Sequence, residues 1–124
     1  MTAHNDNLAL MQRLSRYGIT VSEYQANILR RAAITLDKWS ERECGDDYGC
    51  IERDEVTGIP YHRSSSGRRW RIPDREKGAR KRVETVCNAL GIFWYFQSDP
   101  RGAPLYLSKA PLSDEDYNNG CAVY

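Results

Sequence analysis

The clearest pattern of hydrophobic and polar positions lies between residues 74 and 91. Apolar side chains recur there at spacings of four, three, one and three residues, which places them on one face of a helix. They are Ala79, Val83, Val86, Cys87 and Leu90. Asp74 is a good N-cap, because its carboxylate can accept from the free N–H groups of the first turn, and Glu76 suits the positive end of the helix dipole. Since Gly91 stands where a left-handed residue ends a helix, we predict a helix from Asp74 to Leu90.

A strand pair is predicted directly after this helix. Ile92–Phe96 contains five large apolar residues in a row, which favours a central strand covered on both faces. Asp99–Gly102 has Asp first, Pro second and Gly fourth, as in a type I turn. Leu105–Leu107 then forms the second strand, and Pro104 marks its start because proline cannot donate to a ladder. The segment therefore predicts an antiparallel β-hairpin.

Two helices are predicted at the N-terminus. The first ends at Gly18 and follows residues 1–6, which we expect to be frayed. Its apolar positions are Leu8, Leu10, Met11, Leu14 and Tyr17. Thr20 and Glu23 have capping-box spacing, so we expect a second helix from there to about Glu43. Its buried face is expected to contain Tyr24, Ile28, Leu29, Ala32, Leu36 and Trp39.

Weaker strand patterns lie between residues 50 and 72. Cys50–Asp54 and Ile59–Arg63 have little apolar content, and Pro60 cannot donate to a ladder, so they indicate an edge hairpin. Ser64–Gly67 is expected to be a flexible loop. Residues 69–72 alternate arginine with Trp and Ile, which predicts a brief strand.

The order of these elements indicates the fold class. Helices and strands come in runs, which favours α+β with a mainly antiparallel sheet. We expect an N-terminal helical pair, a weak edge hairpin, a central helix and a C-terminal antiparallel β-hairpin in one domain, residues 1–124. A chain of 124 residues that is 40% hydrophobic can form one core. Residues 111–120 are polar and turn-rich, and residues 122–124 are a last strand or a tail, so about 112–124 are expected to be flexible.

Composition narrows the classes of protein and of site. No apolar run approaches the length of about 20 residues that spans a bilayer, so no membrane partner is expected. The first residues do not have the pattern of a secretory signal, which favours the cytoplasm of a host cell and free thiols. Cys44 and Cys50 match no zinc knuckle. With no P-loop or Rossmann glycine pattern either, we expect no metal and no cofactor.

Charge is strongly divided along the chain. Residues 41–58 hold seven acidic and two basic side chains, and residues 63–82 hold nine basic and two acidic ones. Arginines beside an exposed aromatic ring are typical of single-stranded nucleic-acid binding, since guanidinium groups hold phosphates and the ring stacks a base. The candidate residues are Arg68, Arg69, Trp70, Arg71 and Arg101. Alternatively, the acidic and basic segments pair with each other within the fold or form a solvated surface, with Trp70 in the core, or the basic segment contacts an acidic protein.

The catalytic candidates are few. Glu52, Asp54 and Glu55 lie close together, and paired carboxylates can bind a metal or share acid–base chemistry. Charged clusters beside turns are common surface features, however. Asp74 also loosely resembles an acidic residue of restriction-type nucleases, but its role as a helix N-cap explains it better. His62 stands alone on the expected edge hairpin. We therefore assign no catalytic residue and expect a protein that is not an enzyme.

Aromatic side chains suggest one further site. Trp94, Tyr95 and Tyr106 gather with Arg101 around the C-terminal hairpin. Aromatic walls with an arginine can form a nucleotide pocket or an interface hot spot. The alternative is that most of these rings fill the core.

Three segments carry a resemblance to known proteins. They are Ile51-Glu52-Arg53-Asp54-Glu55 through Pro60-Tyr61, Ile72-Pro73-Asp74-Arg75-Glu76-Lys77-Gly78-Ala79, and Gln97-Ser98-Asp99-Pro100-Arg101-Gly102 with Leu105-Tyr106. Over roughly residues 25–124 the chain resembles a group of small proteins carried by phages and prophages of Gram-negative bacteria. The resemblance implies a genomic setting and no particular activity.

Three functions follow as hypotheses. Small phage proteins without enzyme motifs often act by binding, so the leading one is a phage-derived module that modulates a host factor, such as a host-defence inhibitor of the anti-CRISPR kind. Its partner would be a host protein or ribonucleoprotein complex, and its protein-binding residues are Asp46, Asp47, Asp54, Glu55 and Tyr106. The alternatives are a protein that binds single-stranded nucleic acid through residues 63–82, and one that sequesters a nucleotide signal. An exposed edge hairpin would also favour a homodimer.

Overall fold

The computed structural model describes residues 3–43, 50–97 and 102–123. This part of the chain is α+β, as the sequence predicts. Its elements, in chain order, are α1 (Ala3–Arg16), α2 (Glu23–Glu43), β1 (Cys50–Arg53), β2 (Pro60–Arg63), β3 (Arg69–Arg71), α3 (Arg75–Leu90), β4 (Phe93–Phe96), β5 (Leu105–Ser108), a 3-10 turn η1 (Tyr117–Asn119) and β6 (Cys121–Val123).

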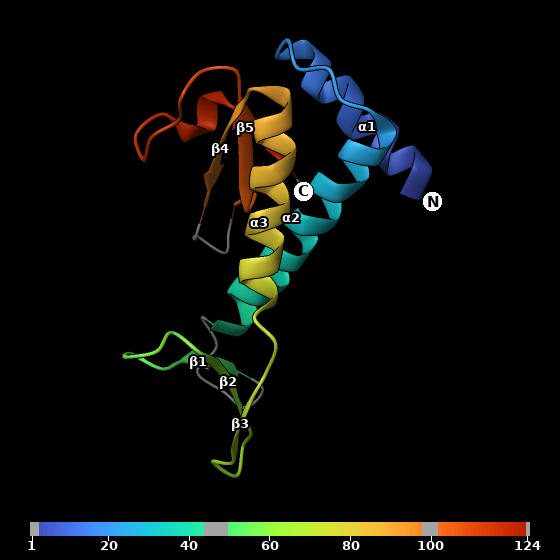
Figure 1. Cartoon of the computed structure of the whole chain (residues 1–124). Helices are drawn as coiled ribbons and strands as arrows, with labels where there is room; N and C mark the ends of the chain where they lie inside the picture. The colour runs from blue at the N-terminus through green and yellow to red at the C-terminus, as the bar shows by residue number, and fades with distance from the viewer. Residues whose placement is uncertain (1–2, 44–49, 98–101, 124) are drawn as a thin grey trace.

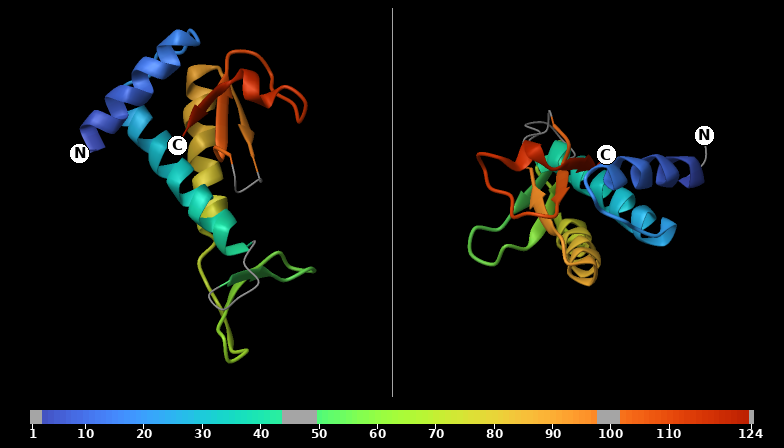
Figure 2. Two further views of the ribbon diagram at one scale, coloured as in Figure 1. Left: turned by 180° about the vertical axis from the view of Figure 1, so that it is seen from behind. Right: turned by 90° about the horizontal axis from the view of Figure 1, so that it is seen from above.

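The six strands form two separate antiparallel sheets of three strands each, with the orders β1-β2-β3 and β4-β5-β6. We call β1-β2-β3 the small sheet. Helices α2 and α3 pack along each other, and α1 packs on α2. The C-terminal sheet lies beside α3, whereas the small sheet extends beyond the C-terminal end of α2 and the N-terminal end of α3 (Figure 1). Figure 2 shows the same separation from behind. The two sheets therefore lie in different parts of the molecule.

The hydrophobic core belongs to the three helices and the C-terminal sheet. It gathers buried side chains from α1, α2 and α3 and the inward-facing residues of β5 and β6. Its largest fully buried members are Leu10, Leu14, Leu29, Leu105, Leu107, Val83, Val123, Cys87 and Cys121. Burial raises the pKa of the Cys87 thiol to about 12. Among residues 50–71, by contrast, only Cys50, Ile51 and Pro60 are buried.

The start of α2 corrects the predicted capping box. Ser22, not Thr20, caps the helix: its hydroxyl accepts from the Gln25 N–H, and the Gln25 side chain accepts from the Ser22 N–H. Helix α2 accordingly begins at Glu23. Tyr24, in the first turn of α2, is 76% exposed, so its predicted burial is wrong.

Helix α3 forms as its pattern predicts. The Asp74 side chain accepts from the Lys77 N–H at 3.0 Å, and Gly91 has a φ of 69°. Ala79, Val83, Val86 and Cys87 are buried. Because that left-handed φ strains any residue with a Cβ, glycine is the residue suited to end α3 here.

The C-terminal sheet differs from its prediction in strand order. Strand β4 is an edge strand, and β5 is the central one, because β6 pairs with the other side of β5. Phe93 is consequently 44% exposed instead of covered on both faces. The type I turn predicted for Asp99–Gly102 lies mostly outside the described residues.

A polar segment covers the outer face of this sheet. Tyr117 of η1 stacks on Tyr95 with ring centroids 4.7 Å apart and meets Tyr106 edge-on at 5.1 Å. The Tyr95 hydroxyl donates to Asp114 at 2.6 Å, which raises the pKa of Tyr95. Asp114 and Tyr117 thus contact the sheet. Of the two alternatives for the chain end, a last strand or a tail, the structure has the strand β6. Within the described residues no helix combines the length and the apolarity that crossing a membrane requires.

Candidate nucleic-acid interface

Two tight turns build the small sheet. In the first, between β1 and β2, the Asp54 carboxylate accepts from the N–H groups of Val56 and Thr57, both at 2.9 Å. These bonds hold the pKa of Asp54 below its ordinary value. In the second, between β2 and β3, the Ser64 hydroxyl accepts from the Arg68 N–H at 3.2 Å. The predicted flexible loop is therefore a closed turn that fixes β3 against β2.

The pairing register decides which side chains share a face. Glu52, Tyr61 and Arg71 lie opposite one another across the three strands, and so do Ile51, His62 and Trp70. Because directly opposed residues share a face and successive ones alternate, the arginines of β3 and Trp70 point to opposite sides of the sheet. The single site predicted for these residues is therefore divided between the two faces of the sheet.

One face of the small sheet carries the arginines, and we call it the arginine face. The guanidinium of Arg69 lies over the Tyr61 ring, 4.5 Å from its centroid. Glu52 forms ion pairs with Arg63 at 2.9 Å and with Arg69 at 3.5 Å. Arg71 is exposed and has no ion pair among the described residues. Three arginines against one glutamate leave this face positively charged.

The opposite face carries the exposed tryptophan. Trp70 packs on His62 with ring centroids 4.5 Å apart, and Arg42 of α2 lies 2.8 Å from Nδ1 of His62. One side of the Trp70 ring is therefore supported, while 45% of the residue stays exposed. A half-exposed ring on a fixed support can stack a base at little entropic cost.

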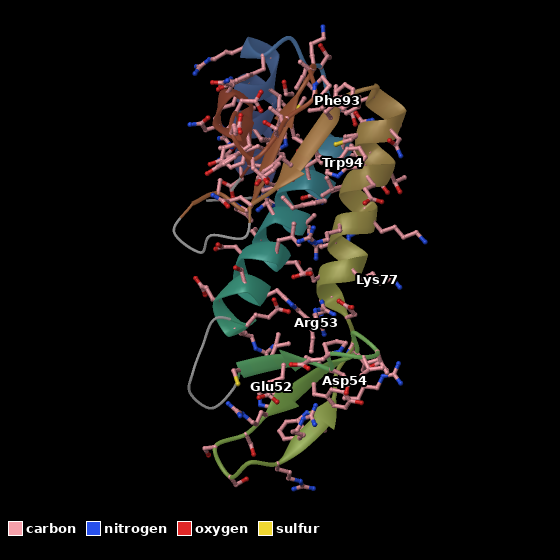
Figure 3. The ribbon with its side chains drawn as sticks, turned by 90° about the vertical axis from the view of Figure 1, so that its left-hand side faces the viewer. Glu52, Arg53, Asp54, Lys77, Phe93 and Trp94 are labelled. Carbon is pink, nitrogen blue, oxygen red and sulfur yellow. The ribbon has the colours of Figure 1, made fainter. Side chains whose placement is uncertain are left out.

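The basic charge continues onto α3. Arg75, Lys77, Lys81 and Arg82 are exposed and form no ion pair within the described part of the chain. Arg80 differs, because it pairs with Glu76. Lys77 projects from the end of α3 next to the small sheet (Figure 3). Six cations of the basic segment thus have no ion pair among described residues: Arg68, Arg71, Arg75, Lys77, Lys81 and Arg82.

Arg53 attaches the small sheet to the helices. Its guanidinium donates to both oxygens of Asp74, at 2.9 and 3.0 Å, and to the Gly58 carbonyl at 2.8 Å. It also pairs with Glu43 of α2 at 3.2 Å and with Glu76 at 3.5 Å. Figure 3 shows it between the sheet and the ends of the two helices. These bonds raise the pKa of Arg53 and lower that of Asp74.

Three of the five predicted protein-binding residues lie in the described part of the chain, and they are divided between the two sheets. Asp46 and Asp47 lie outside the described residues. Asp54 is engaged in its turn and Glu55 is exposed beside it, whereas Tyr106 belongs to β5, in the other sheet. Of the nucleic-acid candidates, Arg68, Arg69, Trp70 and Arg71 are all exposed around β3, and Arg101 lies outside the described residues.

The described residues of the two other candidate groups, the carboxylates of the small sheet and the aromatic rings of the C-terminal hairpin, contact other side chains or backbone groups of the chain. The carboxylates of Glu52 and Asp54 are engaged by arginines and by backbone N–H groups, so they do not form an open acid–base pair. Tyr95 and Tyr106 pack on Tyr117, a residue that the sequence analysis did not single out. Tyr61 was also missed, although its two-residue spacing from Arg63 signals a shared strand face.

Comparison with known proteins identifies no relative of this chain. No family model, no curated protein and no solved structure matches the chain.

Proposed function

We propose that this chain is a non-enzymatic protein that binds single-stranded nucleic acid at β3 and the first turns of α3. The observation that carries the proposal is the exposure of β3. It is an edge strand, and all three of its residues, Arg69, Trp70 and Arg71, are exposed. Its arginines on one face of the sheet and Trp70 on the other are therefore accessible, and a strand accessible on both faces favours contact with a ligand.

The aromatic chemistry supports single strands over duplex. Trp70 is backed by His62 and offers its remaining surface to solvent. A base must be unpaired and unstacked from its neighbours to lie on such a ring, as single-stranded sites require. Base–aromatic stacking of this kind contributes about 1–3 kcal/mol per base.

The charges support binding to phosphates. Arg68 and Arg71 flank Trp70 and have no ion pair among the described residues, and four further cations follow on α3. The acidic side chains nearest to them are already engaged: Glu52 by two arginines and Asp74 by Arg53. Phosphates are therefore attracted to this surface, because these two carboxylates are already neutralised by arginines.

The acidic segment gives weaker support to the host-factor hypothesis. Glu43 and Glu52 are held in ion pairs, and Asp54 closes a turn. These three carboxylates already have partners within the chain, although Glu43 and Glu52 keep 32% and 34% of their side-chain surface exposed. Glu55 is exposed as well. A phage protein can bind nucleic acid, so the two proposals are compatible. The phage origin itself is a proposal that rests only on the resemblance.

The test is fluorescence anisotropy with a labelled oligo-dT at low and high salt. We expect salt-sensitive binding by the wild type, because each phosphate contact adds about 0.7 to the slope of log affinity against log salt. Trp70→Ala should weaken binding about 5- to 150-fold, the equivalent of one lost stack. Arg68→Glu with Arg71→Glu should weaken it further and flatten the salt dependence.

A matched control separates the surface from net charge. Arg31→Glu with Lys38→Glu makes the same charge change at exposed positions of α2. This variant should bind nearly as well as the wild type. Equal losses in both double variants, or no binding by the wild type even at low salt, would contradict the proposal and return the protein-partner hypothesis to first place.

A further inference from the structure

A groove of about 540 Å³ opens beside the small sheet, between the β1–β2 turn, the end of β3 and the start of α3. Its lining includes the apolar residues Ile59, Pro60, Ile72 and Pro73. Arg71 and Lys77 line it as well. Its volume lies in the range of about 300–1,000 Å³ that is typical of small-molecule sites.

The charge around the groove is positive. Asp74 contributes a carboxylate to the lining, but Arg53 donates to both of its oxygens and the Lys77 N–H donates to one of them. Arg71 and Lys77 are exposed and have no ion pair among the described residues. Apolar side chains next to two exposed cations suit a ring that carries a phosphate.

We infer that this groove binds one nucleotide of the strand whose neighbouring base stacks on Trp70. The inference rests on the proposed function. Arg71 connects the two positions, because it follows Trp70 in β3 and lines the groove. The base lies against the prolines and isoleucines of the lining, and its phosphate lies between Arg71 and Lys77. Binding of nucleic acid therefore extends from the edge strand to α3.

A substitution of Lys81 provides a close control for the same substitution of Lys77. Lys81 lies one turn further along α3, is exposed like Lys77 and likewise has no ion pair in the described part of the chain, but it does not line the groove. Lys77→Glu and Lys81→Glu change the net charge equally. Both variants should fold, and glutamate at position 77 is favoured near the positive end of the helix dipole.

The experiment measures the affinity of both variants and of Trp70→Ala for a series of oligo-dT lengths at low salt. Trp70→Ala should weaken binding at every length. Lys77→Glu should leave the shortest oligonucleotides nearly unaffected and weaken the longer ones about tenfold or more, the loss expected for one nucleotide. Lys81→Glu should weaken binding about two- to threefold at all lengths, as a general charge effect does.

The outcomes separate the two proposals. If Lys77→Glu and Lys81→Glu weaken binding equally at every length while Trp70→Ala abolishes it, the groove holds no nucleotide and the proposed function stands. If the wild type binds no oligonucleotide of any length, both proposals are overturned. A length-dependent loss that is specific to Lys77→Glu supports the groove.

Discussion

Replacing Arg53 by alanine should detach the small sheet from the helices without unfolding the core. The guanidinium is the point at which β1 meets α2 and the start of α3, through Glu43, Asp74 and Glu76. It also lies 5.3 Å from the centroid of the Trp39 ring of α2. The small sheet has little buried apolar surface of its own, so these contacts should set its local stability.

The magnitude follows from the geometry. Hydrogen bonds to charged groups contribute about 1.5–3 kcal/mol each. The Arg53 and Asp74 side chains keep 30% and 25% of their surface exposed, however, so solvent screens part of the interaction. We therefore expect a loss of about 2–3 kcal/mol, a factor of about 30–150 in the opening equilibrium of the sheet.

Native-state hydrogen exchange measures this opening residue by residue. In Arg53→Ala the amides of β2 should exchange about 30–150 times faster, while those of β5, at the centre of the other sheet, should change little. Arg53→Lys should give an intermediate result, because lysine keeps the charge but loses the planar fork that holds Asp74.

A neighbouring arginine provides the control. Arg63 pairs with Glu52 at 2.9 Å, but the two side chains are 42% and 34% exposed, and such surface pairs contribute at most about 1 kcal/mol. Arg63→Ala should therefore speed β2 exchange only about fivefold or less. If Arg53→Ala accelerated β2 and β5 equally, or affected β2 no more than Arg63→Ala does, Arg53 would not be the attachment point.

The remaining predictions concern stability. Arg53 holds the pKa of Asp74 below 3.8. The stabilisation that the ionised Asp74 gives the folded state is therefore complete above pH 3.8 and is lost as the pH falls through the folded pKa. Burial raises the pKa of Glu76 above 4.5. The stability that its protonated form gives the folded state is therefore complete below pH 4.5 and is lost as the pH rises through the folded pKa. In urea titrations at pH 7, Asp74→Asn should thus lower the free energy of unfolding and Glu76→Gln raise it, and both differences should shrink toward about pH 3. Gly91→Ala should cost about 1–2 kcal/mol by the same assay, because its φ is 69°. Leu29→Ala should cost about 2–5 kcal/mol, whereas Tyr24→Ala should stay within about 0.5 kcal/mol.

The sequence predicted best where neighbours along the chain determine the structure. The N-cap at Asp74, the apolar face of α3 and the left-handed Gly91 depend on residues within one or two helical turns. The short strands β1, β2 and β3 were also found, because period-2 alternation and turn residues are local signals. The capping box of α2 was misplaced by two residues, because two Ser/Thr residues, each followed three positions later by Glu or Gln, compete there.

Long-range pairing explains the corrections. Ile92–Phe96 has the composition of a central strand, but β5 takes the centre because β6 returns from the chain end to pair with it. The cover over Tyr95 comes from Tyr117, and no local pattern links the two. The separation of Trp70 from the arginines was within reach of the sequence, since alternation along β3 already places them on opposite faces.

The distribution of acidic side chains connects the fold to the proposed site. Within the described part of the acidic segment, Glu43 and Glu52 pair with arginines of the small sheet, and Asp54 closes its first turn. These residues stabilise the sheet and its attachment, while Arg71 of β3 and the exposed cations at the start of α3 have no ion pair among the described residues. The near-neutral net charge of +1 therefore conceals a basic surface. It is the geometry of pairing, more than the amount of charge, that makes this surface suitable for a polyanion.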